Sequence, residues 1–172
     1  FALLASEAPN LPRRHQTLHQ TIDWSHDLLS QDEQTIFRRL GIFTGAFSLQ
    51  AAEAICADDS SSPESFYTIL ASLLDKSLIQ QMEDIDGERH LAMLESIRSY
   101  ALERLEENKE TTAIREKHLT YYITLAGQAT PRSVGLNRWG YLSPLGLECG
   151  NLRAATQWAL EQGRGEVVVQ MC

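Results

Sequence analysis

The stretch "SLIQQMEDIDGERHLAMLES" (Ser77–Ser96) interrupts an otherwise helical sequence and decides the fold. Its two halves, "SLIQQM" and "RHLAML", lack the helical spacing of apolar residues and flank the segment "EDIDGE". Within that segment, Asp86-Gly87 is a strong signal for a tight hairpin turn. The stretch therefore predicts two antiparallel strands joined by a short turn.

Helices are predicted on both sides of this hairpin. In "SQDE", Ser30 and Glu33 have the spacing of a capping box, which predicts a helix that begins after Ser30. Ser48, after the turn "TGAFS" (residues 44–48), is placed to cap a short helix over residues 49–57. Pro63 suits the first position of the longer helix "PESFYTILASLLDKSL". With the closing helix "LESIRSYALERLEEN", this order predicts a winged-helix domain over residues 15–108 in a mostly α-helical chain.

The segment "RHQTLHQTIDWSHDLLSQDEQ" (Arg14–Gln34) carries His15, His19 and His26 together with Asp23, which raises the question of a metal site. His15 and His19 have the i,i+4 spacing that can hold zinc. On a helix, however, His26 lies about 16 Å along the axis from His15, so the three cannot share one ion. We therefore expect an amphipathic helix and no metal site. Its apolar stripe is formed by Leu18, Ile22, Ser25 and Leu29, widened by Trp24 and Leu28.

The remaining regions divide the chain further. Residues 1–14 contain two prolines and read as a connector from a missing upstream domain. Residues 109–172 read as helices and predict the truncated start of an array of helical hairpins of the tetratricopeptide type, although no regular 34-residue period is visible. The chain begins and ends in mid-pattern, so we expect a piece of a longer protein.

Composition limits the compartment and the chemistry. No apolar run is long enough to span a membrane. Cys56, Cys149 and Cys172 lack the spacing of a zinc site or a disulfide framework, which predicts a cytoplasmic protein. The phosphate-binding patterns GxxxxGK[ST] and GxGxxG are absent, as is the nucleophile pattern GxSxG. We therefore expect no catalytic residue and no enzyme activity in this chain.

The charge distribution argues against direct DNA binding. Residues 1–94 hold six Lys/Arg and fourteen Asp/Glu, a balance of −8, whereas residues 95–172 hold nine of each. Phosphate neutralisation by Lys and Arg dominates the affinity of DNA-binding proteins. The predicted hairpin tip, "EDIDGE", carries four carboxylates. The third helix, which would enter the major groove, is predicted to expose one cation and two anions among Glu64, Ser65, Tyr67, Thr68, Ser72, Asp75 and Lys76.

Four blocks of the sequence resemble one family. The blocks are "HQTLHQTIDWSHDLLSQDEQTIFRRLGIFTGAFSLQAAEAIC" (His15–Cys56), "LASLLDKSLI" (Leu70–Ile79), "MLESIRSYALERLEE" (Met93–Glu107) and "NLRAATQWALEQG" (Asn151–Gly163). They resemble the STAND signal-transduction ATPases, which are related to NB-ARC proteins. Closest are the bacterial ATPases fused to transcription-regulator domains of the LuxR or AfsR/SARP type.

The resemblance implies a P-loop ATPase core before the winged helix and helical repeats after it. In that family the winged helix is a regulatory lid that closes on bound ADP, and a separate helix-turn-helix domain reads DNA. No cofactor is expected in this chain itself, whereas ADP or ATP with Mg²⁺ is expected in the longer protein. The implied partners are the upstream ATPase domain of the same polypeptide and an unknown protein or small-molecule inducer.

The resemblance also points to candidate nucleotide-facing residues. Related NB-ARC proteins carry Met-His-Asp where the hairpin meets the closing helix, and this place is occupied here by Met93, Leu94 and Glu95. Leu94 cannot hydrogen-bond a phosphate as a histidine can, but Arg98, one helical step beyond Glu95, could supply a cation. Alternatively, Met93 and Leu94 belong to the core and Glu95 is favoured by the helix dipole.

The sequence thus supports two hypotheses. The first is a regulatory fragment of a bacterial STAND-type transcriptional regulator, in which the winged helix is a nucleotide-dependent lid and the helical region is a sensor or scaffold. The alternative is a DNA-binding winged-helix transcription factor with a helical dimerisation tail.

Overall fold

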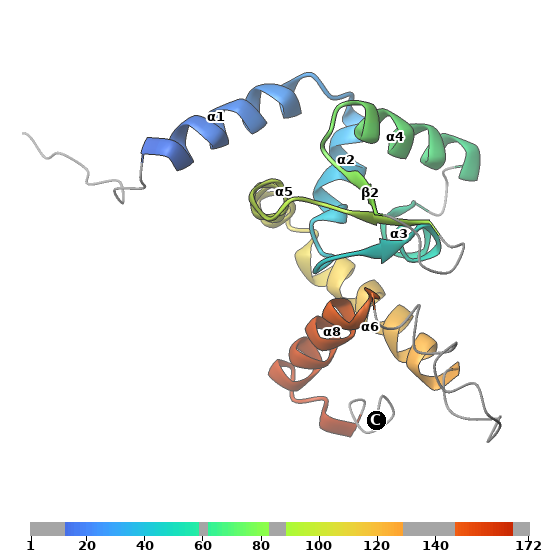
Figure 1. Cartoon of the computed structure of the whole chain (residues 1–172). Helices are drawn as coiled ribbons and strands as arrows, with labels where there is room; N and C mark the ends of the chain where they lie inside the picture. The colour runs from blue at the N-terminus through green and yellow to red at the C-terminus, as the bar shows by residue number, and fades with distance from the viewer. Residues whose placement is uncertain (1–12, 59–61, 83–88, 129–146, 167–172) are drawn as a thin grey trace, which may run out of the picture.

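The computed structural model describes residues 13–58, 62–82, 89–128 and 147–166, with side chains from residue 19 to residue 127 and again in the last range. In chain order the elements are α1 (Arg13–Asp27), α2 (Gln31–Leu40), β1 (Phe47–Ser48), α3 (Leu49–Cys56), α4 (Pro63–Asp75), β2 (Gln80–Met82), β3 (His90–Ala92), α5 (Glu95–Glu107), α6 (Thr111–Gln128) and α8 (Cys149–Glu161). Figure 1 shows α1 on one side of the central body and the pair α6 and α8 on another. None of the described helices combines the length and apolarity needed to cross a membrane.

The order from α2 to β3 confirms the predicted winged-helix arrangement. The two predicted strands, β2 and β3, pair antiparallel, with Gln81 opposite Leu91. The turn at Asp86-Gly87 and the acidic tip around it lie outside the described residues.

The sheet has a third strand that the sequence did not predict. Residues 44–48 were expected to form a turn, but Phe47 pairs with Leu91 and Ser48 with His90, which makes the strand order β1-β3-β2. A strand of two residues is too short to show an alternating pattern, so only its pairing with β3 reveals it.

The predicted helix starts are confirmed. The Ser30 hydroxyl accepts a hydrogen bond from the Glu33 N–H, and the Glu33 carboxylate accepts one from the Ser30 N–H at 2.7 Å, which completes the capping box. The Ser48 hydroxyl accepts a hydrogen bond from the Ala51 N–H and so caps α3, without the reciprocal bond of a capping box. Ser62 caps α4, and Pro63 occupies its first position. Each cap satisfies a backbone N–H that lacks a partner within the helix.

Packing against α5 fixes α1, and this explains an error in the predicted stripe. Ile22 and Leu29 are buried as expected, and Asp23 accepts a hydrogen bond from the Tyr100 hydroxyl of α5 at 2.6 Å. Trp24 and Leu28, expected to widen the buried face, are instead 67% and 61% exposed. They lie on the side of α1 that no described element covers.

The helical arm, α6 and α8, shares one hydrophobic core with the winged-helix elements. The core cluster begins at Ile22 of α1, passes through Phe37 and Tyr100, and reaches Trp158 and Ala159 of α8. The predicted domain boundary, between residues 108 and 109, lies between α5 and α6. Both helices contribute to the same hydrophobic core. Of the predicted connector (residues 1–14), residues 1–12 lie outside the described residues, whereas Arg13 and Arg14 belong to α1 and not to a connector. Residues 129–146 of the predicted helical region also lie outside the described residues.

Two buried polar side chains at the start of α8 attach the arm to the loop before β1 and to β1 itself. Asn151 is fully buried; its Oδ1 accepts a hydrogen bond from the Thr44 N–H at 2.6 Å, and its Nδ2 donates one to the Ala46 carbonyl at 2.7 Å. Glu148 accepts hydrogen bonds from the Ser48 N–H at 3.0 Å and from the Tyr122 hydroxyl of α6. We call these contacts of Glu148 and Asn151 with residues 44–48 the arm clamp.

Gly150 allows the arm clamp to close. A Cβ atom at this position would lie 2.4 Å from the Thr44 carbonyl oxygen, well inside van der Waals contact. Because the obstructing atom belongs to the backbone, it cannot rotate away. Only glycine permits α8 to approach the loop this closely.

We predict that Gly150→Ala destabilises the 172-residue chain by about 1–3 kcal/mol, because α8 must move away from Thr44 and weaken the arm clamp. The matched control is Gly127→Ala in α6, where an added Cβ meets nothing within 4 Å. That control should be neutral or stabilising by up to about 1 kcal/mol. Urea unfolding of both variants measures the difference; equal stabilities would contradict the role given to Gly150.

Candidate functional site

The candidate nucleotide-facing residues lie together at the junction of β3 and α5. Met93 is buried in the core, whereas Leu94 is 54% exposed. The sequence alternative that placed both residues in the core is therefore correct for Met93 and wrong for Leu94. Glu95 and Arg98 form a two-point ion pair on the first turn of α5, with both hydrogen bonds 2.9 Å long. The hydrogen bonds from Arg98 hold the pKa of Glu95 below its ordinary value.

The N-terminus of α5 differs from those of α2, α3 and α4. Those three helices begin after serines whose hydroxyl groups accept a backbone N–H. The N-cap of α5 is Leu94, which provides no side-chain hydrogen bond. The first N–H groups of α5 therefore keep their capacity to bind an anion, which the helix dipole also favours. The carboxylate of Glu95 on the same turn partly offsets this positive potential.

The surface of α4 offers little positive charge. Glu64, Tyr67 and Asp75 are exposed, as the sequence predicted. The predicted cation, Lys76, sits at the C-cap and donates to the Glu33 carboxylate of α2 at 2.6 Å and to the Ser72 hydroxyl. Ser72, expected to be exposed, is half-buried beneath this contact.

The neighbouring cations of α2 are also paired. Arg38 and Arg39 both bind the Glu110 carboxylate, at 2.5 Å and 2.7 Å. Arg39 also binds Asp58 at 2.7 Å. These guanidinium groups therefore fasten α2 to the junction of α5 and α6 and to the end of α3. They are not displayed for an external polyanion.

The three histidines of the histidine-rich segment all lie on α1. Within the described residues no group of three or more His, Cys, Asp or Glu side chains could hold a metal ion. His19 contacts Glu103 at 3.2 Å, and the His26 ring packs against Phe37 and Tyr100. The side chain of His15 lies outside the described residues.

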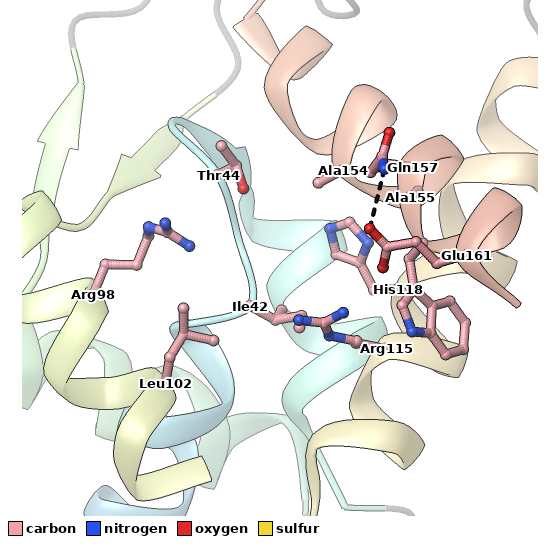
Figure 2. A pocket seen from close by; sticks show the side chains of 11 residues that line it. Ile42, Thr44, Arg98, Leu102, Arg115, His118, Ala154, Ala155, Gln157 and Glu161 are labelled. Carbon is pink, nitrogen blue, oxygen red and sulfur yellow. Dashed lines mark hydrogen bonds between the residues drawn. The ribbon is translucent and has the colours of Figure 1, made fainter. Parts of the chain in front are cut away.

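A pocket of about 280 Å³ lies at the seam between the winged helix and the arm. Figure 2 shows Arg98 of α5 and Arg115 of α6 extending toward this space from different helices. Sequence reasoning identified Arg98 alone, because Arg115 and α8 are brought to it only by the packing of the arm. The complete lining is Ile42, Thr44, Arg98, Leu102, Arg115, His118, Ala154, Ala155, Gln157, Trp158 and Glu161.

Comparison with known families agrees with the element order. Residues 29–106 match the family described as a winged helix-turn-helix domain. This segment has the winged-helix fold that its element order and sheet describe. The match begins just after α1 and ends within α5, so both α1 and the arm lie outside it. No solved structure matches the chain.

Mycobacterial proteins are similar over the winged-helix domain and the arm together. A Mycobacterium tuberculosis (strain H37Rv) protein named "Putative HTH-type transcriptional regulator Rv0890c" is 38% identical over 172 residues, which cover 99% of this chain and 19% of the relative. A Mycobacterium bovis relative with the same description matches to the same extent. "Uncharacterized protein Rv0894" of M. tuberculosis is 38% identical over 120 residues, or 69% of this chain and 30% of the relative. The chain thus spans about a fifth of the length of the relatives named as regulators.

The ion pair between Glu33 and Lys76 predicts a pH-dependent stability. Burial alone would raise the pKa of Glu33, but hydrogen bonds from Lys76, Ser72 and the Ser30 N–H lower it to about 2 from an ordinary value of 4.5. Because the pKa is lower in the folded state, this stabilisation is complete above pH 4.5 and is lost as the pH falls toward 2.

We therefore expect Glu33→Gln to lose about 1–3 kcal/mol at pH 7, with the difference from the unmodified chain shrinking below about pH 4. Glu64→Gln, an exposed carboxylate on α4, is the matched control and should change stability by less than about 0.5 kcal/mol. Urea unfolding between pH 3 and pH 7 makes the comparison. A loss that stays constant with pH would show that the carboxylate charge is not responsible.

Proposed function

We propose that this chain is the regulatory portion of a bacterial transcriptional regulator, in which the winged helix docks on another part of the protein and does not itself read DNA. The observation that carries this proposal is the pairing of Lys76 with Glu33 on the α4 surface, beside the exposed Glu64 and Asp75. A surface of this charge repels phosphates at the place where a recognition helix would meet them. The names of the mycobacterial relatives support the assignment to a regulator.

The finer form of the proposal is a STAND-type switch, in which the winged helix is the lid of an ATPase domain. Leu94 leaves a large apolar side chain exposed at the start of α5, beside backbone N–H groups without a side-chain cap. An ATPase domain that covers Leu94 would bury apolar surface, and a nucleotide phosphate near α5 would meet those N–H groups and Arg98. ADP with Mg²⁺ would then favour the docked state, and exchange for ATP would release it. No catalytic residue is proposed in this chain.

The second candidate is direct DNA binding by α4. The match to a winged helix-turn-helix domain and the names of the relatives favour it, because domains of this fold place a helix in the major groove. The two candidates differ in whether α4 offers positive charge to the DNA phosphates. Lys76, the cation of α4, is paired with Glu33.

We predict that the 172-residue chain does not bind random-sequence duplex DNA more tightly than about 10⁻⁴ M at about 50 mM salt. Fluorescence anisotropy with a labelled duplex at several salt concentrations measures this. Micromolar binding that weakens steeply with added salt would instead establish the second candidate. A double variant, Glu64→Gln with Asp75→Asn, should gain some affinity if α4 approaches DNA at all, because it removes two exposed anions.

For the lid, we predict that Leu94→Asp in the full-length regulator raises transcription from a reporter gene in the absence of inducer. The charged side chain would oppose burial under the ATPase domain and favour the released state. Leu160→Asp on α8 is the matched control, since Leu160 is similarly exposed (52%) but belongs to the arm. Unchanged basal transcription in the Leu94 variant would remove the support for the lid.

A further inference from the structure

The seam pocket combines opposing cationic side chains with an apolar wall. Arg98 reaches it from α5 and Arg115 from α6, whereas Trp158 contributes from α8. In Figure 2 the Arg98 and Arg115 side chains extend from opposite sides of the view, and Ile42 lies between them. Pockets that bind small molecules have this composition, in which apolar walls carry a few convergent polar groups.

Arg115 is the unusual member of this set. Arg98 is already neutralised by Glu95, with which it forms two hydrogen bonds. Arg115 is half-buried, and no hydrogen bond or ion pair joins it to another residue in the part of the chain that the structure describes. A guanidinium offers five donors in a planar array that matches a carboxylate or a phosphate. Its donors are therefore available to an anion that enters the pocket.

His118 provides a second unused polar group at the base of the pocket. It is 3% exposed, and its Nε2 atom has no hydrogen-bond partner among the described residues. Burial lowers the pKa of this imidazole to about 4 despite a hydrogen bond with Asn151, so the ring is neutral at physiological pH. A buried polar atom without a partner costs free energy, and a ligand that reaches it would recover part of that cost.

The α8 side of the pocket limits the form of the ligand. Glu161 lies there, and its carboxylate accepts a hydrogen bond from the Gln157 side chain at 3.0 Å. A ligand with a negative charge at each end would place one of these charges near Glu161, which would repel it. The arginines therefore favour one anionic end, and Trp158 favours a neutral, apolar remainder. The volume of about 280 Å³ suits a molecule smaller than a nucleotide.

We propose that this pocket binds a small organic molecule with one anionic group, a carboxylate or a phosphate, held between Arg98 and Arg115, and with its apolar part against Trp158. A bound ligand would touch both the winged helix and the arm and would stabilise their packing. A role of this ligand as the inducer of the regulator rests on the proposed function. Binding of the ligand depends only on the pocket. Loss of binding would therefore leave the tests of Leu94 and of DNA binding unaffected.

The test titrates the ¹⁵N-labelled 172-residue chain with three probes of similar size: phenyl phosphate, benzoate and the neutral benzyl alcohol. The indole N–H signal of Trp158 reports on the pocket, and that of Trp24, which is 67% exposed on α1, serves as an internal reference. We expect at least one of the anions to shift the Trp158 signal with a Kd of about 0.1–1 mM, and benzyl alcohol to have no effect. The anion that binds distinguishes a carboxylate ligand from a phosphate ligand.

Two variants assign the site. Arg115→Gln should weaken binding of the anion at least about tenfold, because it removes charged hydrogen bonds. It should fold normally, since Arg115 has no partner to lose among the described residues. Arg153→Gln removes an exposed charge on α8 outside the pocket lining and should change the Kd less than about twofold. The proposal fails if neither anion binds below about 10 mM, if benzyl alcohol binds equally well, or if Arg115→Gln leaves the Kd unchanged.

Discussion

The arm clamp is the contact on which the rest of this arrangement depends. Asn151 and Glu148 satisfy backbone groups of the loop that leads into β1, and they do so inside the protein, where an unsatisfied group is costly. The hydrophobic contacts of α6 and α8 hold the arm near the winged helix, but they have little directional preference. The hydrogen bonds, together with the close approach at Gly150, select one position. That position creates the seam pocket and supports β1 at the edge of the sheet.

The charge pairing of the winged helix favours contacts within the protein over contacts with a polyanion. Glu33 performs two tasks, since it closes the capping box of α2 and binds Lys76 at the end of α4. Glu110 similarly holds both arginines of α2. At the start of α5 the arrangement differs, because Leu94 caps no N–H group and remains exposed. Arg98 lies on the first turn of α5 and also lines the seam pocket. The proposed nucleotide contact and the proposed ligand site therefore share this side chain.

Much of the winged helix could be predicted from the sequence because its signals are local. The capping box at Ser30, the cap at Ser48, Pro63 at a helix start and the change of period after Ser77 each depend on residues close together in the chain. The features that were missed depend on distant packing. Phe47–Ser48 becomes a strand only beside β3, and the arm clamp joins residues about a hundred positions apart. Arg115 lines the same pocket as Arg98 only because the arm docks. Trp24 and Leu28 fit a helical stripe, but among the described elements none covers that side of α1.

The most direct test of the central claim, that the start of α5 faces the nucleotide-binding part of a regulator, is hydrogen exchange of the Glu95, Ser96 and Ile97 amides. The first N–H of α5 with a hydrogen bond to a carbonyl four residues earlier is that of Arg98, which donates to the Leu94 carbonyl. The three N–H groups before it have no side-chain cap. They should exchange rapidly in the 172-residue chain. In the full-length regulator they should become protected when ADP is bound and lose that protection with ATP. Equal exchange with and without ADP, accompanied by protection of α4 on addition of DNA, would contradict the account and favour direct DNA binding.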